Sequence, residues 1–462
     1  MHESRISEQS FNYRNENMND DNQDRKPNFK AYYKKYRPYY FSDTIVTYDV
    51  PLTEELFNVQ MDYLSTNKLQ SKFEKFVVAV ASKIITPNIQ PQSGPDGGGD
   101  GKVDAETYEV SKDISDKWYS EESGAAGKEK WAFAISCKKQ WQPKLESDVS
   151  KIVETNRGYT KVLFFTNQYV KSSTRVEKEE SISQKYGIET HIFDRSWFNK
   201  VVFTQGCLDE ALNNLDFSDQ YKIKKVNEGP LDRQRKTRLE ELENSFLRPI
   251  DGLNTEYVDD LKESCILSRE LERPRCETEG RFRRALSECT IHGTRQQYFV
   301  LVYEHGWTSF FWFEDVEAVY KDYLILKDII EEEASVPRVE RLVNTLSNLD
   351  NAAKAGLIEQ NRIIPEIEYI QKLSSTLDGV KPSCKLFLDI ELTVRELLQH
   401  IGGGVEIESV VEKLKPLLLL APSHIDISFE SLYKVMEMLA QYIDDASYDS
   451  MLDELADRLS KK

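Results

Sequence analysis

The stretch QPQSGPDGGGDGKVDAETY, residues 90–108, and the stretch KWAFAISCKK, residues 130–139, decide the fold class of this chain. The first stretch is rich in glycine, which is typical of a tight turn, and its end predicts a strand over residues 105–110. The second stretch contains the short apolar run of residues 131–137, which predicts a buried strand. Together they predict a hairpin that leads into the middle of a sheet.

The sequence on either side of these stretches extends the pattern to helices and further strands. Apolar residues at helical spacing predict a helical segment within residues 52–85, which Pro87 ends. The elements expected downstream are a helix over 145–155, a strand over 161–166, a helix over 172–186, a strand over 188–193 and a helix from Arg195. The order α-β-β-β-α-β-α-β predicts a mixed sheet flanked by helices.

Four regions of different character follow from a pass along the chain. Residues 1–28 are polar and poor in aliphatic residues, so we expect a disordered tail. Residues 29–64 form a basic, tyrosine-rich arm and a lead-in helix, and residues 65–215 form the α/β domain. From residue 216 to 462 the apolar spacing is helical almost throughout, which predicts an all-α assembly or regulatory region.

Charge and cysteine content limit the class of protein. The chain has 462 residues and a net charge of −18, whereas a nucleic-acid-binding protein is usually basic. A local basic groove can still hold phosphates, although tight DNA binding would then need a basic partner or self-assembly. The six cysteines form no CxxC pair, and no apolar run is long enough for a membrane helix. We therefore expect a cytoplasmic protein with reduced thiols and no membrane contact.

The arm has two interpretations. Residues 25–40, RKPNFKAYYKKYRPYY, interleave cations with tyrosines, which suits a nucleic-acid backbone and unstacked bases. In that case Lys34, Lys35 and Arg37 would contact phosphates. Alternatively, the arm is ordered and packs its tyrosines on the domain.

The acidic turn and the strand after it suggest chemistry on a phosphodiester. Such hydrolysis needs a divalent cation beside the phosphate, an activated water and positive charge. The turn carries Asp96, Asp100 and Asp104, and a strand that begins at Asp104 would bring a carboxylate beside Lys138. Ser136 and Lys138 are two residues apart on a strand, so they share a face. Two carboxylates and a backbone carbonyl would suffice for Mg²⁺.

These residues resemble the PD-(D/E)xK, or restriction-endonuclease-like, superfamily, and the resemblance is closest to its Mrr-like branch. The matching positions are Glu74 in SKFEKFVVAV, Asp104 in DGKVDAETY, and Ser136-x-Lys138. The segment GPDGGGDGKVDAETY looks like the effector nuclease domains of bacterial antiphage systems, which accompany STAND or SMC-like ATPases, as in Lamassu. The likeness covers residues 65 to 205. It implies an endonuclease that cuts DNA with Mg²⁺ or Mn²⁺.

The chain departs from the family pattern in two respects. Ser136 stands where the family usually has Glu or Gln, so one metal ligand is missing and Asp100 or Glu106 would have to compensate. The register of the hairpin is also open, because Asp96 fits the pattern as well as Asp100. The remaining predicted contacts are a metal bond from the Cys137 backbone carbonyl and phosphate contacts from Lys102 and Lys139.

Three functions are therefore compatible with the sequence. The first is an effector DNA endonuclease that is restrained by assembly, either as a homo-oligomer or with an SMC-like or STAND ATPase. The second is a nucleic-acid-binding or scaffold subunit whose nuclease core has decayed, which the serine at 136 favours. The third is an RNase on the same fold, because fold alone does not fix the substrate. The chain has no Walker-type phosphate loop, so an ATP-driven step would come from a partner.

Overall fold

A computed structural model describes residues 28–91, 103–108, 129–246, 252–400 and 407–428, with a few isolated residues between 432 and 457. The chain divides into two compact units, which are taken one at a time below. One is residues 38–294, and the other combines residues 1–37 with 295–462. The first unit therefore contains the sheet and also the helices between residues 216 and 294.

A mixed five-stranded sheet forms the centre of the first unit. Its strand order is β2-β3-β4-β5-β6, and the strands are β2 (Ile89–Pro91), β3 (Ala105–Thr107), β4 (Lys130–Ser136), β5 (Tyr159–Thr166) and β6 (Glu189–Phe193). β2, β3 and β4 pair antiparallel, whereas β4, β5 and β6 pair parallel. The predicted mixed sheet is confirmed, and β4 is its central strand.

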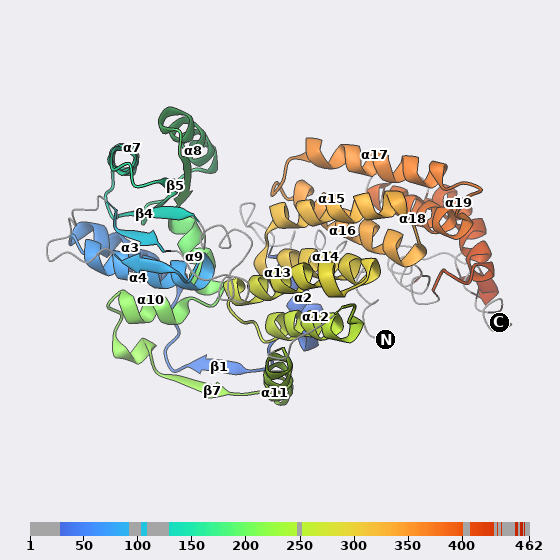
Figure 1. Cartoon of the computed structure of the whole chain (residues 1–462), viewed down its shortest axis with the longest axis horizontal. Helices are drawn as coiled ribbons and strands as arrows, with labels where there is room; N and C mark the ends of the chain where they lie inside the picture. Colours follow the sequence, from blue (N-terminus) through green and yellow to red (C-terminus); the bar gives the residue numbers. More distant parts are fainter. Residues whose placement is uncertain are drawn as a thin grey trace. The chain divides into compact units, whose positions relative to one another are not determined.

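Helices cover both faces of this sheet (Figure 1). One face carries α3 (Glu54–Thr66), α4 (Gln70–Ile84), α9 (Arg195–Phe203) and α10 (Leu208–Asn214), and the other carries α7 (Trp141–Glu154) and α8 (Ser172–Tyr186). Along β4, Phe133 and Ile135 pack on the first face, and Ala132 and Ala134 pack on the second. Because both faces are covered, β4 is apolar at successive positions rather than at alternate ones.

The predicted order of elements is confirmed from α4 to α9. The helical segment predicted within residues 52–85 consists of two helices, α3 and α4. The glycine-rich turn falls largely within residues 92–102, which lie outside the described residues, but the antiparallel pairing of β2 with β3 is that of a hairpin. The structure adds one element that was not predicted, a two-stranded sheet of β1 (Ile45–Tyr48) and β7 (Lys224–Asn227). Both strands are short and largely exposed, so no burial pattern marks them in the sequence.

Helices make up the rest of both units, as predicted. The sheet unit also contains α11 (Pro230–Ser245), α12 (Thr255–Glu270) and α13 (Arg275–His292). The helical unit contains α14 (Arg295–Thr308), the π-helical turn η3 (Ser309–Phe313), α15 (Val316–Glu332), α16 (Val336–Lys354), α17 (Gln360–Thr376), α18 (Pro382–His400) and α19 (Ile407–Leu420). Its central element is the end of α14 with η3, where Phe310, Phe311 and Trp312 are buried.

The arm is an ordered helix, α2 (Phe29–Tyr36), which belongs to the helical unit. Its buried residues are Phe29 and Tyr33. The Phe29 ring lies 4.5 Å from that of Phe310, and the Tyr33 ring lies 4.4 Å from that of Phe311. The arm is thus ordered, as one of the two interpretations predicted, but Tyr33 packs within the helical unit and not on the α/β domain.

Two further expectations concern the whole chain. All six cysteines are free thiols and buried, as expected. None of the helices in the described part of the chain combines the length and apolar character that a membrane span requires.

Candidate active site

The candidate site lies where β3 stops pairing with β4. β3 pairs with β4 at Ala105↔Phe133 and Glu106↔Ala132, and the Asp104 amide donates to the Phe133 carbonyl at 3.0 Å. Beyond this point the Asp104 side chain continues the ladder, because its Oδ2 accepts a hydrogen bond from the Ile135 amide at 2.6 Å. The backbone edge of β4 is thus met by a carboxylate instead of a strand.

Helix α4 supplies the next groups along this edge. Gln70, the first residue of α4, donates from Nε2 to the Ile135 carbonyl at 2.6 Å and accepts at Oε1 from the Cys137 amide at 3.0 Å. The same Nε2 donates to Glu74 Oε1 at 3.0 Å. Gln70 therefore holds the predicted acid, Glu74, beside the end of β4. Sequence reasoning missed Gln70, although its spacing of four residues from Glu74 places both on one helix face.

Helix α7 brings an acid and an ammonium to the other face of the sheet. Lys144 Nζ donates to Asp148 Oδ1 at 2.5 Å. Asp148 is only 6% exposed, and its Oδ2 is buried without a hydrogen-bond partner among the described residues. Leu145 follows Lys144 in α7, and Val149 follows Asp148. Both belong to the same apolar cluster as Val103, the neighbour of Asp104. The charges of Asp148 and Lys144 act on the carboxyl group of Asp104, the residue that precedes β3.

Sequence reasoning missed Asp148 and Lys144, although the sequence contains a signal for Asp148. The buried face of α7 consists of Leu145, Asp148, Val149 and Ile152. An acid in the apolar stripe of an amphipathic helix is costly to bury unless it is paired or binds a cation.

The acids at the end of β4 influence one another. Burial, together with the charges of Glu74 and Asp148, raises the pKa of Asp104 to about 7, although the hydrogen bond from Ile135 and the charge of Lys144 oppose the shift. Burial also raises the pKa of Glu74 and of Asp148, again opposed by Lys144. Lys144 is the cation common to all three carboxyl groups. Without more positive charge, the site resists full ionisation.

The predicted SxK segment begins at Ser136, the last residue of β4, so Lys138 lies beyond the strand and does not share a strand face with Ser136 as predicted. Ser136 is buried, and its Oγ accepts from the Lys138 amide at 3.2 Å. The Lys138 residue is exposed, and its charge lowers the pKa of Asp148. Lys139 is exposed as well. The carbonyl of Cys137, predicted as a metal ligand, instead accepts from Ser65 Oγ at 2.8 Å, and burial raises the pKa of the Cys137 thiol to about 12.

Of the other predicted residues, Glu106 lies in the described part of the sheet unit but outside this group. Glu106 forms an ion pair with Lys130 at 3.1 Å and accepts a hydrogen bond from the Tyr159 hydroxyl at 2.5 Å, farther along β3 from the end of β4. The Glu106 carboxylate is thus engaged by Lys130 and Tyr159 and does not join Asp104. Asp96, Asp100 and Lys102 lie outside the described residues. Lys34, Lys35 and Arg37 belong to the helical unit.

The carboxylate oxygens of this group are compatible with binding a hard divalent cation. Within the described ranges, no three His, Cys, Asp or Glu side chains lie together as a preformed metal cluster. Mg²⁺ keeps several waters, however, and is usually bound through one or two carboxylates. The Oδ2 atom of Asp148, which has no donor among the described residues, is the kind of group that a cation would satisfy. Asp104, Glu74 and Asp148 all offer oxygen ligands, which suit Mg²⁺ or Mn²⁺.

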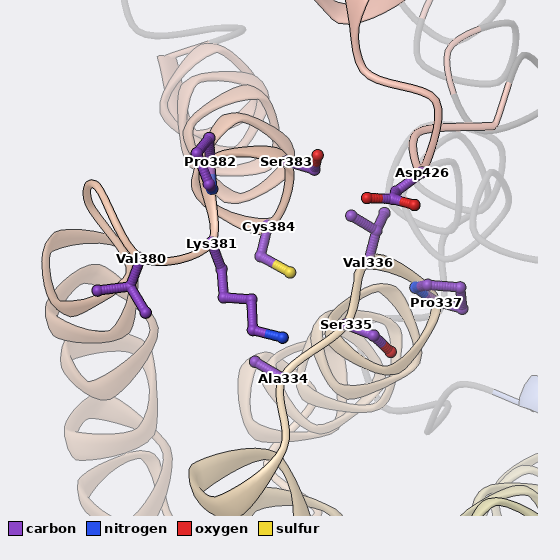
Figure 2. Close-up of a pocket in the computed structure, with 10 residues that line it drawn as sticks. All are labelled: Ala334, Ser335, Val336, Pro337, Val380, Lys381, Pro382, Ser383, Cys384 and Asp426. Carbon is purple, nitrogen blue, oxygen red and sulfur yellow. The ribbon is translucent and has the colours of Figure 1, made fainter.

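The helical unit contains a separate pocket of about 470 Å³ between the starts of α16 and α18 (Figure 2). Figure 2 shows Lys381 and Cys384 directed into this space, with Asp426 near Val336. None of the residues predicted from the sequence to take part in catalysis or binding lines it. The pocket is therefore distinct from the candidate site at β4.

No protein-family model, curated protein or solved structure matches this chain. The functional argument therefore depends on the site geometry and on the motif resemblance.

Proposed function

We propose that the sheet unit is a metal-dependent phosphodiesterase that cuts DNA. The observation that carries the proposal is Asp104, a half-buried carboxyl group at the point where β3 stops pairing with β4, whose pKa is raised to about 7 by burial and two neighbouring acids. Strongly perturbed acids beside an ammonium are typical of functional sites. The position of this group at the end of a central strand is also the position that the resemblance to PD-(D/E)xK nucleases assigns to the metal ligand.

Each residue of the group has a role in this proposal. Asp104 would hold Mg²⁺ or Mn²⁺, and the bound cation would supply a polarised water and neutralise the phosphate charge. Lys138, exposed beside the end of β4, would contact the scissile phosphate. Glu74, whose pKa is raised by burial, would accept the proton of the attacking water. The water oxygen bonds to phosphorus, and the bond from phosphorus to the leaving sugar oxygen breaks.

The choice of DNA and the place in a larger assembly come from the motif resemblance alone. That resemblance points to an effector nuclease of an antiphage complex, restrained by self-assembly or by an SMC-like or STAND ATPase. The net charge of −18 is compatible with a protein that binds DNA through a local basic surface or together with a partner.

A second candidate, a subunit that binds but does not cut, has one observation in its favour. Ser136 replaces the expected acid and is buried, with its hydroxyl bonded to the backbone of Lys138. In that case Asp104 would serve only to extend the β ladder. This candidate predicts nucleic-acid or partner binding without cleavage, whichever metal is supplied.

Cleavage assays separate the candidates. The full chain is incubated with supercoiled plasmid or with a single RNA, in Mg²⁺, Mn²⁺ or EDTA, beside Asp104→Asn, Lys138→Ala and the control Glu146→Gln. Metal-dependent cutting of DNA that both site variants lose and the control keeps supports the proposal. Binding without cutting favours the second candidate, and cutting of RNA alone identifies an RNase. Equal cutting by all variants refutes the site.

A further inference from the structure

Helix α7 carries a feature that the roles given above do not use. Asp148 has one oxygen bonded to Lys144 at 2.5 Å and the other, Oδ2, buried with no donor among the described residues. A carboxylate that is 94% buried normally has both oxygens satisfied, because an unsatisfied charged oxygen costs free energy. The orphan oxygen therefore indicates a partner other than the described residues.

The position of Asp148 identifies the kind of partner. Leu145 and Val149, on the same part of α7, belong to the same apolar cluster as Val103, which is followed by Asp104 and then by β3. The charge of Asp148 raises the pKa of Asp104, which indicates that the two carboxylates are close enough to repel one another. Three acids, Glu74, Asp104 and Asp148, share Lys144 as a neighbouring cation. A divalent cation would offset the remaining negative charge.

We propose that α7 completes the metal site, with Asp148 as its second carboxylate ligand and Lys144 as a stand-in for the cation until a metal ion binds. This inference rests on the function proposed above and assigns the ligand that Ser136 cannot provide. When the cation binds, Lys144 loses its place at Asp148 and becomes available to the phosphate. A surface ion pair between Glu146 on the same helix and Lys185 on α8 has no such role and provides a matched control.

Binding of Mn²⁺ alone to the full chain tests the inference, with free Mn²⁺ followed by electron paramagnetic resonance. Asp148→Asn keeps an acceptor for Lys144 but removes the charge, and we expect Mn²⁺ affinity to fall roughly 10-fold or more. Lys144→Met removes the competing ammonium, and we expect affinity to rise roughly threefold or more. Glu146→Gln and Lys185→Met should bind as the unchanged protein does.

The outcomes distinguish this inference from the proposed function. If Asp104→Asn abolishes binding while Asp148→Asn and Lys144→Met leave it unchanged, the α7 assignment is wrong and the proposed function stands. If the unchanged protein and Asp104→Asn bind Mn²⁺ alike and neither cuts DNA, the proposed function itself is wrong. Should Asp148→Asn fail to fold by circular dichroism, Lys144→Met decides alone, because a merely structural ion pair predicts no gain in affinity.

Discussion

Three buried acids of the helical unit have different surroundings from the acids at the end of β4 in the sheet unit. In the helical unit each of three buried acids has a cationic or imidazole partner: Asp322 with His305 at 2.7 Å, Glu366 with Lys327 at 2.7 Å, and Asp350 with Lys354 at 2.8 Å. In the sheet unit, Asp104, Glu74 and Asp148 share Lys144, and one oxygen of Asp148 has no donor among the described residues. Removing one member of a buried pair destabilises a fold. Acids that lack enough positive charge around them are instead suited to bind a cation.

Breaking a satisfied pair in the helical unit should give the largest effect. Asp322→Ala leaves buried His305 without its partner, and loss of one member of a buried pair costs about 3 kcal/mol or more. Urea unfolding monitored by tryptophan fluorescence should report this loss, because Trp307 and Trp312 are buried in the same unit. DNA cleavage per folded molecule should be unchanged. A stability within error of the unchanged protein would show that this pair is not structural, and the contrast between the units would disappear.

The corresponding change in the sheet unit should act on activity and not on stability. Asp104→Asn keeps an acceptor for the Ile135 amide but removes the charge, so we expect cleavage to fall roughly 100-fold or more. In EDTA at pH 8 its free energy of unfolding should equal or exceed that of the unchanged protein, because a carboxylate crowded by Glu74 and Asp148 is removed. A clear loss of stability would instead identify Asp104 as a structural ladder residue.

The sequence predicted much of the sheet unit because its signals are local. The apolar run of β4 and the helical spacing of α4 each indicate an element by themselves, and Asp104 and Glu74 follow from motif positions. Asp148 and Lys144 did not emerge, because Lys and Asp four residues apart on a helix usually form an ordinary surface pair. Only the fold shows that Asp148 is buried. Gln70 was missed for a similar reason. Its side chain bonds to the backbone of Ile135, which is 65 residues away in the sequence and lies on β4 beyond the point where β3 stops pairing.

The pH dependence of stability sharpens the contrast through Asp104. Its pKa rises from an ordinary value of 3.8 to about 7 in the folded protein. Between these pH values Asp104 has lost its proton in the unfolded chain but keeps it in the folded chain. The stabilising contribution of Asp104 to the free energy of unfolding is therefore fully present below pH 3.8 and is lost as the pH rises toward 7. In EDTA, stability should therefore fall by more than about 1 kcal/mol between pH 5 and pH 8, relative to Asp104→Asn under the same conditions.

Urea unfolding of the unchanged protein and of Asp104→Asn, each at pH 5 and pH 8, measures this difference in stability. Subtracting the change in Asp104→Asn from that in the unchanged protein removes effects of the overall charge. A parallel pH dependence would mean that Asp104 ionises normally and that the site is not short of positive charge. Added Mn²⁺ should reduce the difference, because a bound cation favours the ionised carboxylate.

The smallest effect should come from the exposed ion pair that joins α7 to α8. Glu146 and Lys185 are 49% and 57% exposed, so water screens their attraction. Glu146→Gln should change the free energy of unfolding by less than about 0.5 kcal/mol, and Mn²⁺ affinity and cleavage should not change. Glu146 lies two residues from Asp148 on the same helix, so this variant tests whether burial, rather than residence on α7, makes an acid functional. A loss of metal binding in Glu146→Gln would indicate that cations are held by the general negative charge of the surface and that no particular carboxylates form a site.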